Sequence, residues 1–395
     1  MPKGLILAIR KKYEENIKKG APWIPVTEII GNSALETAVS GELGKILSLS
    51  GKFLATGYYN QKSYIACRIL SRDPNEKIDA SFFCRRIAAA LEKREKLFPG
   101  GYYRLIHSEA DGLPGLILDR FGGTLICQIS TAGMERLKPQ LLATLGKTLA
   151  PETIIFRNDV PARLKEGLKN YVSVAKGEAQ GFTKIHENGC VYFADLLRGQ
   201  KTGWFYDQRE NRKFIADLAE GKSVLDCYCY NGGFGILAAN HGAKSVTFID
   251  SSARALELAA LAAKENSLLE SCEFIRAKAF DALEKLQKAG RKFDIVLLDP
   301  PAFVKTRADK KSGMMGYERL MKLGISLIAP SGILALTSCS HHAPRGELKK
   351  LLENCLKKSE REFQLLKSAG AAPDHPKHPL LPESDYLKFF AFRVE

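Results

Sequence analysis

From about residue 204 to the C-terminus, the chain alternates short apolar runs with amphipathic stretches. Segments with helical spacing, of which ARALELAALAAKENS is one, follow the runs SVLDCYCY, SVTFID, EFIRAKAF, FDIVLLD and GILALTSCS. Strands that alternate with helices pair in parallel, because each helix returns the chain to the starting edge of the sheet. The pattern predicts a doubly wound, mostly parallel α/β sheet whose ligands bind at the carboxyl ends of the strands.

Aspartates close the first three predicted strands, at Asp226, Asp250 and Asp281. The turn after Asp226 contains Gly232 and Gly233, but it lacks the Gly-x-Gly-x-x-Gly spacing that cradles a pyrophosphate. Each aspartate alone is explained as the N-cap of the next helix. Together they indicate a cofactor with ribose and adenine but no phosphate, S-adenosylmethionine (SAM). Asp250 is expected to accept hydrogen bonds from the ribose hydroxyls, and Asp281 from the adenine amino group.

The fourth predicted strand leads into Asp299-Pro300-Pro301, in which two prolines fix the backbone directly after the carboxylate. Phe303 follows them closely. Loops of the form Asp-Pro-Pro-aromatic resemble those of methyltransferases that act on bases and amides, where the loop contacts the planar group. We therefore expect this loop to lie over the reacting base.

The fifth predicted strand ends at Cys339, which places a thiol at the same edge of the sheet as Asp299. Free cysteines are usually small buried hydrophobic residues, and this is the alternative for Cys339. As a thiolate, Cys339 would add to C6 of a cytosine and make C5 nucleophilic toward the SAM methyl group. Asp299 would hydrogen-bond N3 and the exocyclic amine as charge develops there.

Charge favours a polyanionic partner. The 395 residues carry a formal net charge of +15, and cationic side chains placed near phosphates release condensed counterions. Many basic proteins only have solvated basic faces, so charge alone does not identify the partner. The segment KTRADKK after the Asp-Pro-Pro motif is predicted to be a basic loop that contacts phosphates around a target nucleotide, or else a solvated loop. The residues expected to contact RNA are Pro300, Pro301, Phe303, Lys305, Arg307, Lys310 and Lys311.

The N-terminal half shows a different pattern. Up to about residue 75, short β-rich runs bounded by Gly and Asn predict a small β-barrel. Residues 76–98 predict a helix, and two strands, a helix around 134–149 and two more strands are expected after it. We therefore expect a barrel domain over 1–75, an α+β middle domain over 76–190 and the α/β domain over 191–395.

The apolar run at residues 5–9 is too short for a secretory signal, and no stretch approaches the roughly 20 apolar residues of a membrane span. The nine cysteines are scattered, with no paired Cys-x-x-Cys motifs, which argues against a zinc site and against a disulfide framework. We expect a cytoplasmic protein without a metal site.

The assembled motifs resemble the RlmI family of 23S ribosomal RNA cytosine-C5 methyltransferases. The resemblance covers nearly the whole chain through KFLATGYYNQKSYIACRIL, RLIHSEADGLPGLILDRFG, GQKTGWFYDQRENR, DCYCYNGGFG, DPPAF and TSCSHH. It implies a Rossmann-like class I SAM-dependent methyltransferase domain with a mostly parallel seven-stranded sheet. An RNA-binding PUA domain, which is a small β-barrel, and an α+β middle domain would precede it.

The resemblance also implies residue roles. It places Gln208 near SAM and Cys339 in the position of the nucleophile, and it allows a homodimer. The DPPAF loop lacks the second cysteine that follows proline in the wider group of RNA cytosine-C5 enzymes. Another base must therefore remove the C5 proton.

Two other functions stay open at this point. An enzyme that methylates a purine nitrogen also uses an Asp-Pro-Pro loop and needs no thiol. A ribosome-assembly factor would bind SAM without using it, although a decayed site should have lost part of the set formed by Asp226, Asp250, Asp281, Asp299 and Cys339.

Overall fold

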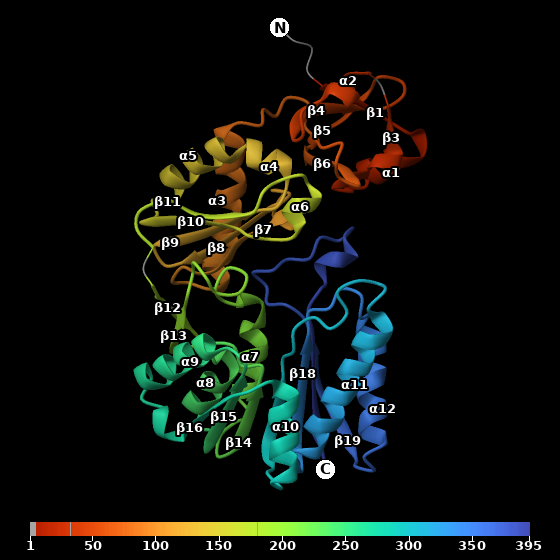
Figure 1. Ribbon diagram of the computed structural model, residues 1–395. Coiled ribbons are helices and arrows are strands. Elements are labelled where there is room, and N and C mark those ends of the chain that lie inside the picture. Colours follow the sequence, from red (N-terminus) through yellow and green to blue (C-terminus); the bar gives the residue numbers. More distant parts are fainter. Residues whose placement is uncertain (1–4, 32, 180) are drawn as a thin grey trace. The chain divides into compact units, whose positions relative to one another are not determined.

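The computed structural model describes residues 5–31, 33–179 and 181–395 (Figure 1). The chain divides into two compact units. The first contains Met1–Thr183, Asp195–Trp204 and Asp374–Pro382, and the remaining segments form the second. Two short stretches far along the chain therefore complete the N-terminal unit, which the sequence does not indicate. Within the described ranges, no helix is both long and apolar enough to cross a membrane.

The N-terminal part of the first unit consists of short strands and helices, namely β1 (Leu5–Ile9), α1 (Lys11–Lys18), β2 (Trp23–Pro25), β3 (Ile29–Ile30), α2 (Ser33–Thr37), β4 (Glu42–Leu47), β5 (Phe53–Tyr59) and β6 (Ile65–Ser71). Its six-stranded sheet has the order β2-β6-β5-β4-β1-β3. The runs predicted as strands between residues 42 and 71 form β4, β5 and β6, which pair antiparallel. The first three strands are too short to show alternation in the sequence, and β1 pairs parallel with β4.

The rest of the first unit is built on a five-stranded sheet with the order β11-β10-β9-β8-β7. Its elements are α3 (Ala80–Leu97), β7 (Tyr102–His107), β8 (Leu116–Phe121), β9 (Thr124–Ile129), α4 (Ala132–Arg136), α5 (Lys138–Thr148), β10 (Thr153–Asn158), α6 (Ala162–Lys165) and β11 (Tyr171–Lys176). The predicted helix over 76–98 is confirmed as α3, and it begins where Asp79 accepts hydrogen bonds from the Ser81 and Phe82 N–H groups. Three strands precede the central helices where we expected two, because the Gly122-Gly123 turn separates β8 from β9.

Tyr58 of β5 joins the two sheets of the first unit. Its side chain is almost fully buried, and its hydroxyl donates to the Pro114 carbonyl at 3.0 Å and lies 2.9 Å from the Thr131 hydroxyl. A Cβ atom added at Gly133 would lie 1.9 Å from the Tyr58 ring, so the helix α4 backbone packs directly on that ring. The two sheets therefore belong to one compact unit, and the boundary between the expected domains 1–75 and 76–190 stays a prediction.

The second unit is built on a seven-stranded sheet with the order β16-β15-β14-β17-β18-β20-β19. The strands from β16 to β18 pair in parallel, and β20 runs antiparallel to both of its neighbours. This confirms the predicted doubly wound α/β sheet. The strands are β14 (Ser223–Cys227), β15 (Ser245–Asp250), β16 (Cys272–Arg276), β17 (Phe293–Leu298), β18 (Ile328–Ser338), β19 (Phe363–Ala369) and β20 (Lys388–Val394).

The helices of the second unit are α7 (Arg209–Ala216), α8 (Gly233–Asn240), α9 (Ala253–Glu265), α10 (Ala279–Lys288), α11 (Lys310–Ser326) and α12 (Arg345–Lys357). Right-handed crossovers place α8 and α9 on one face of the sheet, and α10, α11 and α12 on the other (Figure 1). The second face is packed by one large apolar cluster that includes Leu283, Leu320 and Leu352. Both faces of the parallel strands are therefore covered, so their runs are apolar throughout rather than alternating.

A separate two-stranded sheet, β12 (Thr183–Glu187) and β13 (Cys190–Ala194), lies mainly in the second unit. We expected the run around β13 to be the last strand of the middle domain, and this was wrong. The Asn266 side chain, at the end of α9, both donates to the Val191 carbonyl and accepts from the Val191 N–H group, at 2.7 and 3.0 Å. That pair of hydrogen bonds holds β13 to α9.

Candidate functional site at the carboxyl edge of the parallel sheet

Parallel pairing aligns the ends of the central strands. Cys227 of β14 lies opposite Ile249 of β15 and opposite Leu298 of β17, and Leu298 lies opposite Leu336 of β18. The residues next to these positions therefore share one edge of the sheet, as expected from the sequence. This edge carries Asp226, Asp250, Asp299 and Cys339.

Asp226 is the most buried acid of this edge, with 1% of its surface exposed. Its Oδ2 accepts a hydrogen bond from the Gly235 N–H group at 2.8 Å. Its Oδ1 is buried and accepts no hydrogen bond from any residue that the structure describes. A buried acceptor without a donor is costly, so Oδ1 is a place where a ligand donor would stabilise the site.

The turn between β14 and α8 requires glycine. Gly232 has φ +81°, and a Cβ atom there would meet the Cβ of Ala259 at 3.0 Å. At Gly235 a Cβ would lie 2.3 Å from the Phe248 ring. Gly233 is the first residue of α8. The backbone is therefore held close to the sheet edge, where a ligand can approach it.

Asp250 organises the same turn. Its Oδ2 accepts from the Tyr230 N–H group at 3.0 Å, and its Oδ1 accepts from the Ser252 N–H group at 2.8 Å. Tyr230 has φ 51°, a conformation that non-glycine residues rarely adopt. The N-cap of α9 is Ser252, which accepts from the Ala255 N–H group, so the N-cap interpretation does not apply to Asp250.

Asp281 lies elsewhere than expected. Strand β16 ends at Arg276, and Asp281 is an exposed residue in the first turn of α10. The apolar spacing of Ala279, Ala282, Leu283 and Leu286 extends that helix toward the strand, so its N-cap is Lys278. The expectation that Asp281 closes the third strand was wrong, and its contact with adenine stays a prediction.

The Asp299 carboxylate is held from two sides. Its Oδ1 accepts a short hydrogen bond from the Thr337 hydroxyl on the neighbouring strand. Its Oδ2 lies 3.4 Å from Nε2 of Gln208, whose own Oε1 accepts from the Asn211 amide at 2.7 Å. The carboxylate is therefore oriented before any ligand binds. Thr337 was missed in the sequence, although it stands at the strand end two residues before Cys339.

A buried ion cluster fixes the segment that carries Gln208. The Glu187 carboxylate on β12 pairs with Arg209 at 3.1 Å and with Arg212, both in α7, and each of these side chains is at most 5% exposed. Arg212 also donates to the Phe205 carbonyl at 2.7 Å. Sequence reasoning missed these residues, since only the charged run RENR after Gln208 hints at them. Their effect is to hold the start of α7 against the β12–β13 sheet.

Cys339 follows directly after β18 and is half-buried. The hydroxyls of Ser338 and Ser340 both form hydrogen bonds with the buried Tyr317 hydroxyl, at 2.7 and 2.9 Å. Side chains alternate along extended backbone, so Thr337 and Cys339 lie on the side opposite Tyr317. The thiol thus shares a side of the strand with the hydroxyl that holds Asp299.

Lys388 lies beneath the cysteine loop. It is paired with Ser338 across the antiparallel strands β18 and β20, and only 4% of its surface is exposed. Its Nζ donates to the Ser340 carbonyl at 2.7 Å. Burial, followed by the nearby charge of Arg345, lowers the pKa of Lys388, whereas Asp385 and Cys339 raise it. Sequence reasoning missed this residue, because a lysine at the start of an apolar strand is expected to be exposed.

The aromatic residue of the Asp-Pro-Pro loop packs inward. Pro300 is buried and Pro301 is exposed. The Phe303 ring lies 4.8 Å from the Tyr317 ring and 6.3 Å from the Phe280 ring, measured between centroids. Part of the Phe303 ring thus packs in the core of the second unit. Only the exposed part of the ring can stack on a base.

The basic segment after the loop is only partly a loop. Lys305 and Arg307 are exposed loop residues, whereas Lys310 and Lys311 begin helix α11. The expectation of a loop through residue 311 was therefore wrong, because the apolar positions of α11 extend the helix to Lys310. Lys310 pairs with Glu347 at 2.8 Å, and the other three cations point to solvent.

Comparison with known families agrees with this architecture. The family model for S-adenosylmethionine-dependent methyltransferases matches residues 169–380, and a PUA-like domain matches residues 7–72. The ribosomal RNA large subunit methyltransferase I of Aeromonas hydrophila is 37% identical over 394 residues, which cover 97% of this chain and 98% of that protein. The protein of the same name from Photobacterium profundum is 35% identical and covers 98% of both chains.

Solved structures agree in fold. SMU.776, a putative methyltransferase crystallised in complex with SAH, has a TM-score of 0.83 and covers 99% of this chain and 100% of its own. A putative SAM-dependent methyltransferase from Streptococcus mutans has a TM-score of 0.82 with 99% of this chain covered and 100% of its own. Both are 20% identical to this chain, so they show the fold alone.

Asp226→Asn tests the state of the buried carboxyl group. Burial, followed by the charges of Asp299 and Asp250, raises the pKa of Asp226 from 3.8 to about 7. A raised acid pKa contributes stability that is complete below about pH 4 and is lost as the pH rises through about 7. Relative to D226N, the wild-type free energy of unfolding should therefore fall by about 4 kcal/mol between those pH values. Urea denaturation without cofactor measures this, and parallel pH profiles would contradict the raised pKa.

Proposed function

The chain belongs to the family of the ribosomal RNA large subunit methyltransferases I, and we propose that it forms 5-methylcytidine in 23S ribosomal RNA. The observation that carries the proposal is the position of Cys339 directly after β18, two residues beyond the Thr337 hydroxyl that donates to the Asp299 carboxylate. A thiol is what separates attack through a pyrimidine carbon from methylation of a purine nitrogen, which needs none. The names of the relatives support ribosomal RNA of the large subunit as the substrate.

The cofactor of this enzyme is S-adenosylmethionine, which supplies an electrophilic methyl group when bound. The buried Oδ1 of Asp226 fits a cationic group of such a cofactor, because it has no donor among the described residues. The glycine turn leaves the backbone open for close approach. The residues that would hold the cofactor are Gln208, Asp226, Gly232, Gly233, Asp250, Asp281 and Asp299.

Cys339 acts as the nucleophile in this proposal. Its thiolate forms a bond to C6 of the target cytosine, which moves the electron pair of the C5–C6 double bond and makes C5 nucleophilic. After methylation, C5 loses its proton to a base, the double bond re-forms and the C6–sulfur bond breaks. The Asp299 carboxylate, held by Thr337 and Gln208, accepts hydrogen bonds from the base edge at N3 and the exocyclic amine.

Cys339→Ala is the direct test. We expect methylation of unmodified 23S ribosomal RNA to fall by at least about a thousandfold, since the covalent step is lost, while SAM binding is kept. Labelled SAM and nucleoside mass analysis identify the product as 5-methylcytidine. RNA carrying 5-fluorocytidine should trap a covalent adduct with the wild-type protein and none with C339A.

Cys84→Ala is the matched control, because Cys84 is an exposed free thiol in the first unit. It should methylate and trap like the wild type. A methylated purine, or full activity in C339A, would contradict the cytosine mechanism and favour nitrogen methylation. Absence of methyl transfer to both deproteinised and assembled RNA would favour a SAM-binding assembly factor.

Lys388 positions and charges the cysteine loop in this proposal. Its ammonium group holds the Ser340 carbonyl and lies close enough to Cys339 for their charges to interact. A cation near a thiol favours the thiolate. The other charges around Lys388 are those of Arg345 and Asp385, which pair with each other at 3.4 Å.

Lys388→Met should therefore shift the pH profile of kcat/KM to higher pH. If the thiol pKa rises by about one unit, the variant loses about tenfold at pH 7 and recovers much of that loss near pH 9. Lys388→Arg keeps the charge and should keep the profile closer to that of the wild type. An equal loss at every pH would mean that Lys388 only supports the loop.

The cations after the Asp-Pro-Pro loop are proposed to contact RNA phosphates beside the target base, together with Pro300, Pro301 and Phe303. Lys305, Arg307 and Lys311 are exposed, and Lys310 shares its charge with Glu347. Replacing all four by Gln should flatten the salt slope of RNA binding by about two to three units, at roughly 0.7 per phosphate contact. An unchanged slope in a salt titration would mean that these four cations are only solvated and do not contact RNA.

The homodimer stays a prediction.

A further inference from the structure

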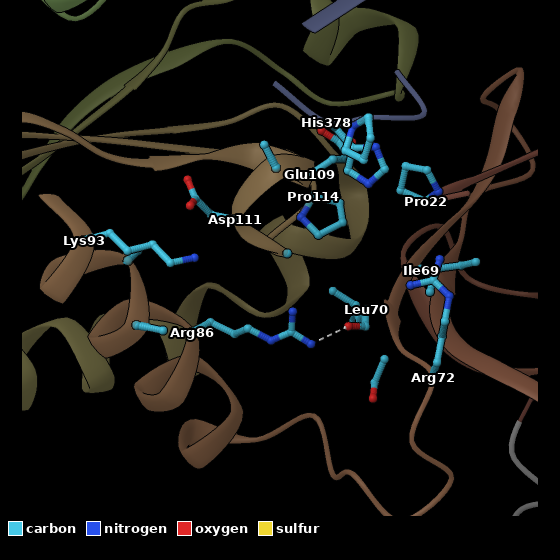
Figure 2. A pocket seen from close by; sticks show the side chains of 16 residues that line it. Pro22, Ile69, Leu70, Arg72, Arg86, Lys93, Glu109, Asp111, Pro114 and His378 are labelled. Atoms are coloured by element: carbon cyan, nitrogen blue, oxygen red, sulfur yellow. Dashed lines mark hydrogen bonds between the residues drawn. The ribbon is translucent and has the colours of Figure 1, made fainter. Parts of the chain in front are cut away.

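The first unit holds a cavity of about 460 Å³ that no role described above uses (Figure 2). It lies between strand β6 and helix α3, and the turn Ser108–Asp111 and the segment around His378 complete its wall. All of its lining residues belong to the first unit. The cavity is therefore separate from the Cys339 site, which lies in the second unit.

Cations from two elements face this cavity. Arg86 and Lys93 are seven residues apart on α3 and so share one face of that helix, and Figure 2 shows both side chains extending into the cavity. Arg72, which directly follows β6, lies across from them. Burial, followed by the charge of Arg86, lowers the pKa of Arg72.

The acids of the cavity wall are already neutralised. Oε1 of Glu109 accepts from Arg68 at 2.9 Å and from the Trp23 indole at 2.8 Å. Asp111 accepts two hydrogen bonds from Arg94, at 2.9 and 2.6 Å. Their charges are thus compensated by buried arginines, which leaves the cavity with a positive potential.

Several donors of the cavity cations are unused. Arg72 donates through Nε and Nη2 to the Ile17 and Ala21 carbonyls, and no described residue accepts from its Nη1. Arg86 donates through Nη2 to the Leu70 carbonyl at 3.1 Å, and the same Nη2 lies 3.7 Å from the Glu76 carboxylate, which also pairs with Arg85. The Nε and Nη1 atoms of Arg86 have no acceptors in the described ranges. Lys93 is exposed and forms no ion pair with any residue that the structure describes. These donors match the oxygens of a phosphate group.

The rest of the wall suits a nucleoside. Proline rings of Pro22, Pro114 and Pro379 line the cavity and offer apolar surface to a base or sugar. His378 accepts from the Leu380 N–H group through Nδ1, so the neutral ring carries its proton on Nε2. A cavity of this size that joins unused cationic donors to apolar walls fits one nucleotide.

We propose that this cavity binds one nucleotide of the RNA substrate, with the phosphate held by Arg72, Arg86 and Lys93. The inference rests on the proposed function, which supplies the RNA. It adds a contact far along the sequence from the Asp-Pro-Pro loop, and thus a second anchor on the substrate.

Lys93→Gln is the decisive variant, because Lys93 is exposed and forms no ion pair with a described residue, so its loss should leave the fold intact. Its matched control is Lys96→Gln, since Lys96 lies on the same helix and pairs with the exposed Glu92. We expect K93Q to lower the salt slope of RNA binding by about 0.7 and K96Q to leave it unchanged. The double variant R86Q/K93Q should raise the RNA dissociation constant about tenfold while SAM affinity stays that of the wild type.

The outcomes separate the two proposals. If the wild-type protein neither binds nor methylates ribosomal RNA, the proposed function fails. If it does both while K93Q and R86Q/K93Q keep its affinity and slope, only the cavity inference is overturned. Inorganic phosphate that raises the melting temperature through Lys93, without any change in the RNA slope, would also overturn it and indicate a free anion. RNA with 4-thiouridine should cross-link to the peptide around Lys93 or Pro114 if the inference holds.

Discussion

The parallel register of β14, β15, β17 and β18 is the constraint on which the candidate site depends. Cys227 is paired in register with Ile249 and with Leu298. Asp226 and Cys339, which are more than one hundred positions apart in the chain, therefore lie at the same edge of the sheet. A one-residue slip of any strand would turn Asp250, Asp299 or Thr337 to the other face of the sheet. The apolar cluster under α10, α11 and α12 opposes such a slip, since it would expose core residues. The core therefore sets the chemistry by fixing which side chains meet.

A second constraint comes from outside the sheet. Gln208 reaches Asp299 from a segment that precedes β14, and the buried Glu187 carboxylate holds that segment through Arg209 and Arg212. Removing one partner of such a cluster leaves an uncompensated buried charge, which is strongly destabilising. The Asp299 carboxylate is thus oriented by a strand neighbour and by a helix that is fixed independently. Gln208, Arg209 and Arg212 of the run GQKTGWFYDQRENR therefore contribute to the site although they precede the first strand of the sheet.

The sequence was informative where a periodic pattern repeats. The alternation of strands and helices from residue 204 predicted the sheet, and strand ends predicted Asp226, Asp250, Asp299 and Cys339 as neighbours. It failed at Asp281, because the apolar face of α10 continues to Ala279 and moves the strand end back to Arg276. It also failed at β13, since pairing with β12 and contact with Asn266 are tertiary choices that no local pattern contains. The sequence did not predict the burial of Lys388 for a similar reason, because the start of β20 is buried only by tertiary packing.

Two buried ionisable groups of the site, Asp226 and Lys388, have pKa values shifted in opposite directions by the same cause. Burial raises the pKa of Asp226 and lowers that of Lys388, so each charged form is disfavoured in the free protein. A bound cation beside Asp226 and a thiolate beside Lys388 would each relieve one penalty, and both arise in the proposed reaction. Groups that cost stability in the free protein persist where a ligand or a reacting atom compensates them. Ligand binding then removes the destabilising cost of these buried groups, so the second unit should gain stability when its cofactor is bound.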